Sequence, residues 1–128
     1  MVELLDLEAC FNMIYSPKIW ERFTPNSGPV FDSHVFEEIT YRCPVCEYMI
    51  SFKDSDFRKH SHSHFSNLNL KDSNDLDFYI ANNNLESASF LDFYCPICKT
   101  ATRILFSGGH GGRHGDYIVD IEYALIIR

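Results

Sequence analysis

Alternating apolar and polar residues near the C-terminus predict a β-strand over residues 117–127. We expect this strand to bury one face and expose the other, with Val119, Ile121, Tyr123 and Leu125 inside and Asp120, Glu122 and Ala124 outside. Apolar or aromatic stretches predict three further strands at residues 35–41, 90–94 and 100–106. The second half of the chain is therefore expected to be mainly β.

The N-terminal part has a helical spacing of apolar residues instead. Residues at three- and four-residue steps predict a helix over residues 1–14, namely Leu4, Leu7, Phe11 and Ile14. Ser16 as an N-cap and Pro17 at the first helical position indicate a second short helix over residues 16–23. The predicted fold class is therefore α+β, a mainly antiparallel β-sheet with one or two N-terminal helices.

Two short cysteine motifs interrupt the strand pattern, Cys43-Pro44-Val45-Cys46 and Cys95-Pro96-Ile97-Cys98. A Cys-x-x-Cys turn brings two sulfur atoms to one metal ion at about 2.3 Å, and a second turn completes a tetrahedron. Four thiolate ligands leave no open position for water or substrate. The motifs therefore predict one structural Zn²⁺ site with Cys43, Cys46, Cys95 and Cys98 as ligands.

Two disulfides or a redox pair are the alternative for these cysteines. The proline in each motif and the absence of a secretory signal weigh against a secreted disulfide framework. A fifth cysteine, Cys10, lies far from either pair, and we expect it to be a buried apolar residue.

Each motif follows a predicted strand and precedes another apolar stretch, a layout that resembles the zinc ribbon, in which two β-hairpins carry the cysteine knuckles. The resemblance covers residues 35–128 and implies a sheet built on the metal site. The spacing departs from that pattern, because residues 47–94 separate the knuckles whereas a compact site has about 15–20 residues there. We expect a single domain, 1–128, with a helical segment at 1–34 and a zinc-ribbon-like sheet at 35–128 that contains this long insertion.

The insertion has two parts of opposite charge. Residues 51–64 carry Lys53, Arg58, Lys59 and the alternating histidines His60, His62 and His64. Residues 67–92 are acidic; within them, 75–80 could be a strand or a helical turn, and the asparagines at 82–84 signal a turn. The candidates for a partner-binding face are Asp72, Asp75, Asp77, Phe78, Tyr79, Glu86 and Asp92. An ordinary solvated face is the competing interpretation.

The chain is acidic overall, with 18 Asp and Glu against 11 Lys and Arg and a formal net charge of −7. Duplex nucleic acid is a poor partner for such a surface, because its binding depends on cations that displace counterions from phosphates. A basic protein is an easier partner. The N-terminus lacks the basic start of a signal peptide, and no apolar run approaches the ~20 residues of a membrane span. We therefore expect a cytoplasmic protein without a membrane partner.

No motif typical of catalysis is present. The glycine-rich residues 108–115 could bind an anion, but they lack the lysine and Ser/Thr of a P-loop, so we expect a long hairpin turn. The three alternating histidines could hold a transition metal if their segment were a strand, whereas the alternative is a solvated polar loop. Because the recognisable metal site is closed, we expect no enzymatic activity.

The leading functional interpretation is a non-enzymatic acidic protein-binding module stabilised by zinc. In its size, its acidity and its ending of a knuckle and a glycine loop, the chain resembles the small immunity proteins that neutralise bacterial toxins, and this resemblance implies a basic toxin domain as partner. The alternative is a zinc-ribbon nucleic-acid-binding or transcription-associated protein, whose basic and aromatic strip would comprise Lys53, Arg58, Lys59, Arg103, Tyr41, Phe52 and Phe57. A metal-dependent hydrolase would need an additional metal ion at the three histidines.

Overall fold

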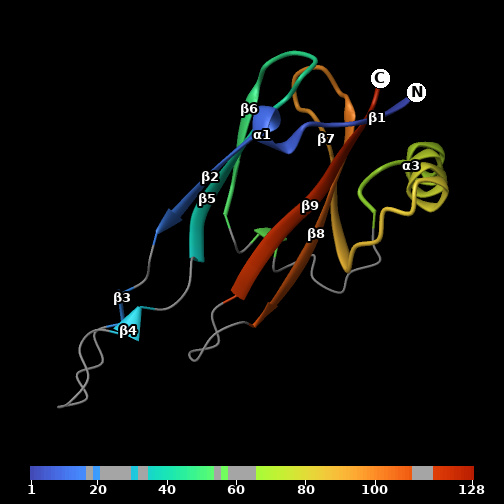
Figure 1. Ribbon diagram of the computed structural model, residues 1–128. Coiled ribbons are helices and arrows are strands. Elements are labelled where there is room, and N and C mark those ends of the chain that lie inside the picture. Colours follow the sequence, from blue (N-terminus) through green and yellow to red (C-terminus); the bar gives the residue numbers. More distant parts are fainter. Residues whose placement is uncertain (17–18, 21–29, 32–34, 54–55, 58–65, 111–116) are drawn as a thin grey trace.

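The computed structural model describes residues 1–16, 19–20, 30–31, 35–53, 56–57, 66–110 and 117–128 (Figure 1). Its strands and helices, in chain order, are β1 (Val2–Leu4), α1 (Leu7–Cys10), β2 (Phe11–Ser16), β3 (Ile19–Trp20), β4 (Val30–Phe31), β5 (Val35–Arg42), β6 (Met49–Phe52), α3 (Leu70–Asn82), β7 (Ser89–Tyr94), β8 (Ala101–His110) and β9 (Tyr117–Ile127).

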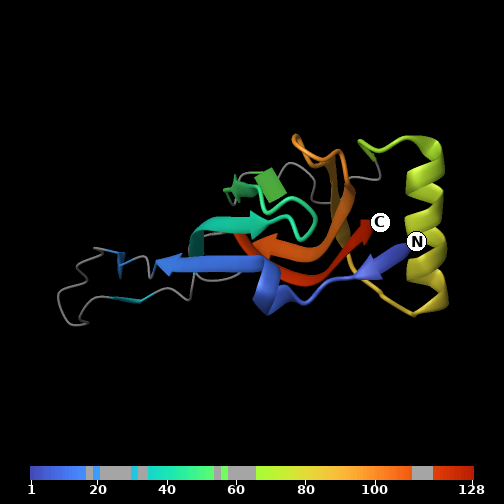
Figure 2. The same ribbon diagram turned by 90° about the horizontal axis from the view of Figure 1, so that it is seen from above.

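All strand pairs are antiparallel, as the sequence predicts. The larger sheet has the order β1-β9-β8-β7, a second sheet has the order β2-β5-β6, and β3 pairs with β4. Seen from above, the β2-β5-β6 sheet lies on one side of the four-stranded sheet and α3 lies on the other (Figure 2). The strands predicted at 35–41, 90–94, 100–106 and 117–127 correspond to β5, β7, β8 and β9.

One apolar core lies between the two larger sheets. Tyr41 of β5 is fully buried there, and its ring centroid is 5.7 Å from that of Phe93 on β7. Phe52 of β6 also contacts Phe93, with ring centroids 5.4 Å apart. Because burial of one large apolar side chain stabilises by about 1.5–3 kcal/mol, this core accounts for the docking of one sheet on the other.

A second core lies on the opposite face of the four-stranded sheet, beneath α3. Leu76 of α3 is fully buried, and Tyr79 and Ile80 pack partly buried beside it. These three residues are three and four positions apart, so they share one helix face. Leu105 and Leu125 supply the sheet side of this core. Both faces of the four-stranded sheet are thus covered.

A β-bulge changes which residues of β9 face each core. Leu105 pairs with Tyr123 but Phe106 pairs with Ile121, so Glu122 is the extra residue. The predicted single buried face is therefore wrong: Val119 and Ile121 contribute to the core between the sheets, together with Ala124 and Ile126, whereas Tyr123 and Leu125 contribute to the core beneath α3.

The predicted helix over residues 1–14 is wrong. Val2–Leu4 is strand β1, which pairs with the end of β9. Only Leu7–Cys10 is helical, with the Asp6 carboxylate accepting a hydrogen bond from the Glu8 N–H at 3.1 Å. Phe11 then begins β2, which pairs with β5. Strand pairing with distant segments outweighs the weak local preference that the apolar spacing indicated.

The second predicted N-terminal helix, over residues 16–23, is also not found. Ser16 is the last residue of β2, and Ile19–Trp20 pairs with Val30–Phe31 as a short antiparallel ladder. Residues 17–18 and 21–23 lie outside the described residues. Among the described residues of the helical segment expected at 1–34, only the single turn α1 is helical.

The main helix lies in the insertion instead. Asn69 caps α3, with its side-chain oxygen accepting from the backbone N–H of Asp72 at 2.8 Å. At the other end, the backbone and side-chain N–H groups of Asn83 both donate to the Tyr79 carbonyl, at 3.1 and 2.9 Å. Asn84 has φ of 54°, a left-handed conformation that asparagine tolerates. The turn signal at 82–84 is confirmed, and the possible helical turn at 75–80 belongs to a 13-residue helix.

The glycine-rich residues fall partly within a strand. Gly108 and Gly109 belong to β8 and pair with Val119 and Ile118 of β9. Residues 111–115, the rest of the predicted loop, lie outside the described residues.

Candidate functional site

The first cysteine knuckle closes the β5–β6 hairpin. The Cys43 N–H donates to the Tyr48 carbonyl at 2.9 Å, and the Glu47 N–H donates to the Cys43 carbonyl at 2.8 Å. Glu47 takes a left-handed φ of 65°, which turns the chain back after the second cysteine. A non-glycine residue in this conformation costs about 1 kcal/mol, so the fold holds the knuckle against a local preference.

The second knuckle repeats this geometry at the end of the β7–β8 hairpin. The Cys95 N–H donates to the Thr100 carbonyl at 3.0 Å, and the Lys99 N–H donates to the Cys95 carbonyl at 2.9 Å. Lys99 has φ of 62°, matching its counterpart in the first knuckle. Two equivalent turns, one from each sheet, therefore face each other.

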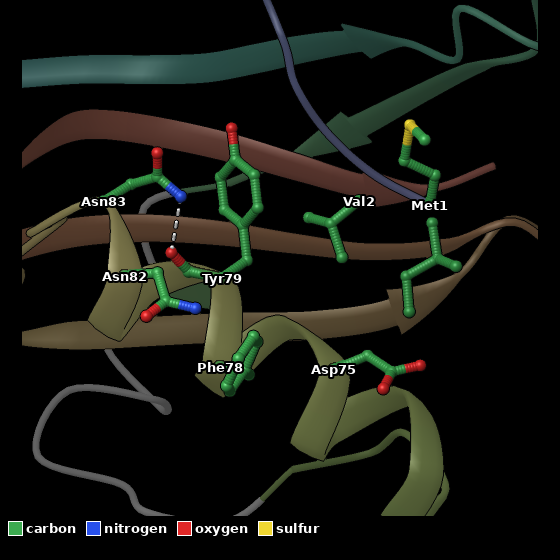
Figure 3. A pocket seen from close by; sticks show the side chains of 8 residues that line it. Met1, Val2, Asp75, Phe78, Tyr79, Asn82 and Asn83 are labelled. Carbon is green, nitrogen blue, oxygen red and sulfur yellow. Dashed lines mark hydrogen bonds between the residues drawn. The ribbon is translucent and has the colours of Figure 1, made fainter.

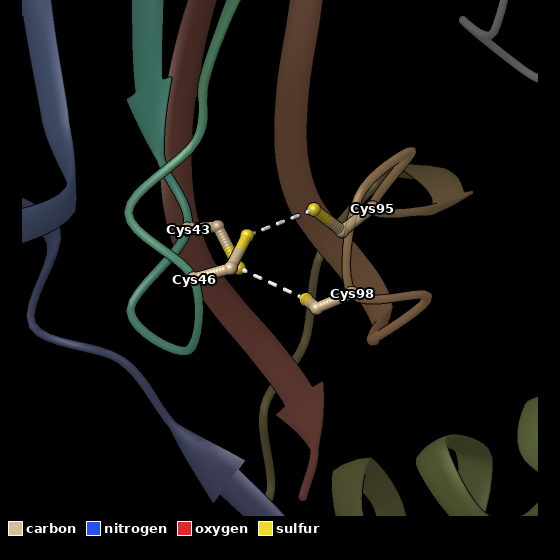
Figure 4. A group of neighbouring side chains, drawn as sticks. All are labelled: Cys43, Cys46, Cys95 and Cys98. Atoms are coloured by element: carbon tan, nitrogen blue, oxygen red, sulfur yellow. Dashed lines mark hydrogen bonds between the residues drawn. The ribbon is translucent and has the colours of Figure 1, made fainter.

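The four knuckle sulfur atoms form one cluster (Figure 4). Cys43 Sγ lies 3.6 Å from Cys98 Sγ, and Cys46 Sγ lies 3.5 Å from Cys95 Sγ. All four sulfur atoms lie within 4.8 Å of one another. A tetrahedral ion with sulfur ligands at about 2.3 Å requires sulfur separations of about 3.8 Å. The cluster thus fits a single metal ion, as the sequence predicts.

Burial and hydrogen bonding shift the pKa values of Cys43 and Cys98 in opposite directions. Burial opposes ionisation of Cys98, but the hydroxyl and N–H of Thr100 outweigh it and lower the Cys98 pKa to about 6. Burial raises the pKa of Cys43 to about 12, although the N–H groups of Cys46 and Val45 favour its thiolate. A coordinated metal ion keeps thiols deprotonated, so it would supply the charge that four thiolates need.

The remaining cysteine lies away from this cluster. Cys10 is buried in the core between the sheets, and burial raises the pKa of its thiol. All five cysteines are free thiols in the structure. In the described part of the chain, the four knuckle cysteines are the one group of three or more His, Cys, Asp or Glu side chains placed to share an ion.

The candidate partner-binding residues are divided between the surface and the interior. Asp75 and Phe78 are exposed on α3, and Glu86 is exposed beyond its end. Asp72 is partly buried and accepts a hydrogen bond from the Tyr94 hydroxyl at 2.8 Å. Tyr79 packs against the core beneath α3.

The last candidates, Asp77 and Asp92, belong to an ion-pair network that sequence reasoning did not identify. Arg103 is 1 % exposed, and its Nε and Nη2 donate to the two carboxylate oxygens of Asp92 at 2.8 and 2.9 Å. Its Nη1 donates to Asp77, and Nη2 also donates to the Ser73 hydroxyl at 3.2 Å. Asp92 is 1 % exposed, so it is removed from the candidate surface.

The same network ties α3 to the sheet. Asp77 and Ser73 are on α3, whereas Arg103 and Asp92 are directly paired on β8 and β7. The guanidinium carbon also lies 4.5 Å from the centroid of the Phe90 ring, where the charge interacts with the aromatic face. A helix held in this way presents its outer face rigidly.

The proposed basic and aromatic strip does not form as a surface. Arg103 is buried and ion-paired, and Tyr41 and Phe57 have no exposed area. Arg58 and Lys59 lie outside the described residues, as do His60, His62 and His64.

The chain matches no protein-family model, no curated protein and no solved structure. None of the helices in the described ranges is long and apolar enough to cross a membrane.

Proposed function

We propose that this chain is a non-enzymatic protein-binding module, stabilised by one structural zinc ion, that recognises a basic protein through α3. The observation that carries the proposal is the outer face of this helix, where Phe78 is 72 % exposed and the Asp75 carboxylate lies nearby. Leu70 is exposed at the start of the same helix. Exposed apolar side chains among acids, on a helix fixed to its sheet, are typical of a binding surface.

Zinc has a structural role in this proposal. The sulfur separations suit a tetrahedral ion, and four cysteine ligands leave no position at which a substrate could bind. The ion would join the β5–β6 hairpin of one sheet to the β7–β8 hairpin of the other. Its binding energy would therefore stabilise the packing of the two sheets.

A basic partner suits the formal net charge of −7. Complementary charge speeds association, with rate constants that reach about 10⁸–10⁹ M⁻¹s⁻¹ at low salt. The most specific form of the proposal is a cytoplasmic immunity protein that binds and neutralises a basic toxin domain. The zinc-ribbon alternative, binding of nucleic acid, has less support because three members of its expected strip are buried.

The test is affinity purification of the zinc-loaded protein from its own cells at low and moderate salt, with mass spectrometry of bound proteins and analysis of bound nucleic acid. We expect one stoichiometric basic protein that is toxic when expressed alone and harmless when co-expressed with this chain. Recovery of nucleic acid without such a protein would contradict the proposal and favour the zinc-ribbon alternative.

Variants of α3 make the test specific to the proposed face. Phe78→Ala should weaken capture of the partner, because an exposed aromatic anchor is lost while the core beneath the helix is untouched. The control is Met49→Ala, which truncates another exposed apolar side chain on β6. Equal loss of capture in the two variants would exclude α3 as the recognition element.

A further inference from the structure

A groove of about 420 Å³ runs between α3 and β1 (Figure 3). Phe78 and Tyr79 line it from α3, and Val2 and Ile127 line it from the paired ends of β1 and β9. Its volume falls within the range of about 300–1,000 Å³ that is usual for small-ligand pockets. The walls are thus apolar and aromatic, and the groove is large enough for a long side chain.

The side of the groove formed by α3 carries negative charge. Asp75 places an exposed carboxylate there, and Asn82 and Asn83 lie at the C-terminal end of α3. This end carries about half a negative charge from the helix dipole, and no basic residue in the last turn offsets it. The N–H groups of Asn83 are both directed to the Tyr79 carbonyl, so its side-chain oxygen remains an acceptor.

A positive group already lies on the β1 side of the groove. The Met1 ammonium donates to the Arg128 carbonyl at 2.9 Å, a bond that fastens β1 to the end of β9. This hydrogen bond is made to the sheet and not to the acceptors on α3, but the positive charge remains and reduces the attraction of the groove for a second cation.

We propose that this groove binds an arginine side chain of the partner protein. The inference rests on the proposed function and specifies how the face of α3 recognises its partner. The methylene stem of arginine packs against Val2 and Ile127, while the guanidinium group donates to the Asp75 carboxylate. The exposed Phe78 ring offers a surface on which the planar guanidinium stacks.

Other side chains suit the groove less well. Lysine is a compact, strongly hydrated charge that cannot stack, and a neutral aliphatic side chain leaves the rim acceptors without donors. An acidic side chain is repelled by Asp75 and by the helix dipole. The combination of apolar walls, the exposed Phe78 ring and the Asp75 carboxylate one helical turn before it favours arginine.

The test is an NMR titration of the full-length, zinc-loaded protein with the acetylated, amidated tripeptide Gly-Arg-Gly. The comparison peptide has citrulline, which is neutral and nearly the same shape, in place of arginine. We expect saturable shift changes at Val2, Phe78 and Asn82, and at least about fivefold weaker binding of the citrulline peptide. A lysine peptide that binds as tightly as the arginine peptide would overturn the assignment.

Two variants and one control locate the interaction. Asp75→Asn and Phe78→Ala should each weaken binding by about threefold, the range for an exposed charge pair and an exposed cation–π contact. Asp120→Asn is the control, since this exposed carboxylate lies toward the other end of β9. If Asp75→Asn and Asp120→Asn weakened binding of the arginine peptide equally, the peptide would be attracted to the acidic surface in general. This result would overturn the assignment of the groove as its binding site.

The same variants separate this inference from the proposed function. If affinity purification returns a protein partner whose binding survives the double change Asp75→Asn and Phe78→Ala, the groove assignment and the role of α3 fail, whereas a protein-binding function stands. If the arginine peptide occupies the groove but no protein partner is recovered, the groove stands and the proposed function fails.

Discussion

Arg103→Met should destabilise the zinc-loaded protein by about 3–5 kcal/mol, because it removes one partner of a buried ion pair and leaves the other charged. The side chains of Arg103 and Asp92 are 1 % and 0 % exposed, so water cannot replace the lost bonds to Asp92. The Ser66 hydroxyl still donates to the Asp92 carboxylate, but it carries no compensating charge. The Asp77 side chain is 62 % exposed, so water can solvate its carboxylate when Arg103 is removed. Losing this second ion pair therefore adds little to the loss of stability.

Urea unfolding followed by far-UV circular dichroism, at a fixed excess of zinc, measures this change. The corresponding fall in melting temperature is about 12–20 °C for a chain of this size. Arg128→Met is the matched control, because Arg128 pairs with Glu3 at 2.8 Å but both side chains are about half exposed. We expect the control to lose less than about 1 kcal/mol.

The double variant Arg103→Met with Asp92→Leu tests the cause of the loss. It removes both charges together, so no unpaired charge is buried and most of the lost stability should return. If the free energy of unfolding of Arg103→Met lay within about 1 kcal/mol of that of the unaltered protein, the reasoning would be refuted. A double variant as unstable as Arg103→Met alone would refute it too, since the damage would then come from packing.

Three other changes have definite expectations. Cys43→Ser or Cys98→Ser should abolish stoichiometric zinc binding and unfold or aggregate the protein, as seen by elemental analysis and thermal melting; normal melting with zinc retained would contradict a structural site. Removal of zinc with a chelator should likewise unfold the protein, because the four knuckle thiols lose the ion that joins the two sheets; an unchanged circular dichroism spectrum after complete removal of zinc would refute this. Ile126→Ala, at a fully buried position, should lower the free energy of unfolding in urea by about 2–5 kcal/mol. Glu122→Ala, at the bulge, should lower it by about 0.5 kcal/mol or less. Similar losses of stability in the two variants would contradict the assigned orientation of β9.

The four-cysteine cluster could be predicted because the geometry of each knuckle is local. Each Cys-x-x-Cys unit fixes two sulfur positions within one turn, and the strands on both sides of each knuckle have clear apolar patterns. The helix α3 is harder to predict from the apolar pattern of the sequence, since Leu76 is its one fully buried residue. A signal did exist in the Asn69 cap and in the spacing of Leu76, Tyr79 and Ile80.

Other features depend on pairing between distant strands. The ion pair of Arg103 with Asp92 is signalled by single charges in two apolar strands, but only the register of β7 against β8 brings them together. The bulge that reorients part of β9 is likewise a property of two strands and not of one. The short β1 is a strand because the end of β9 is available to pair with it, which its own sequence does not show.

The placement of the cysteines has a consequence for synthesis of the chain. Each knuckle supplies two cysteines to the cluster, and Cys95 follows Cys43 by 52 residues in a chain of 128. A nascent chain that ends before Cys95 can offer only the first pair of sulfur atoms, which is half of a tetrahedral site. Tight capture of the ion must therefore wait for translation of the second hairpin and for its docking on the first. A filled site then distinguishes chains that contain both hairpins from those that end before Cys95.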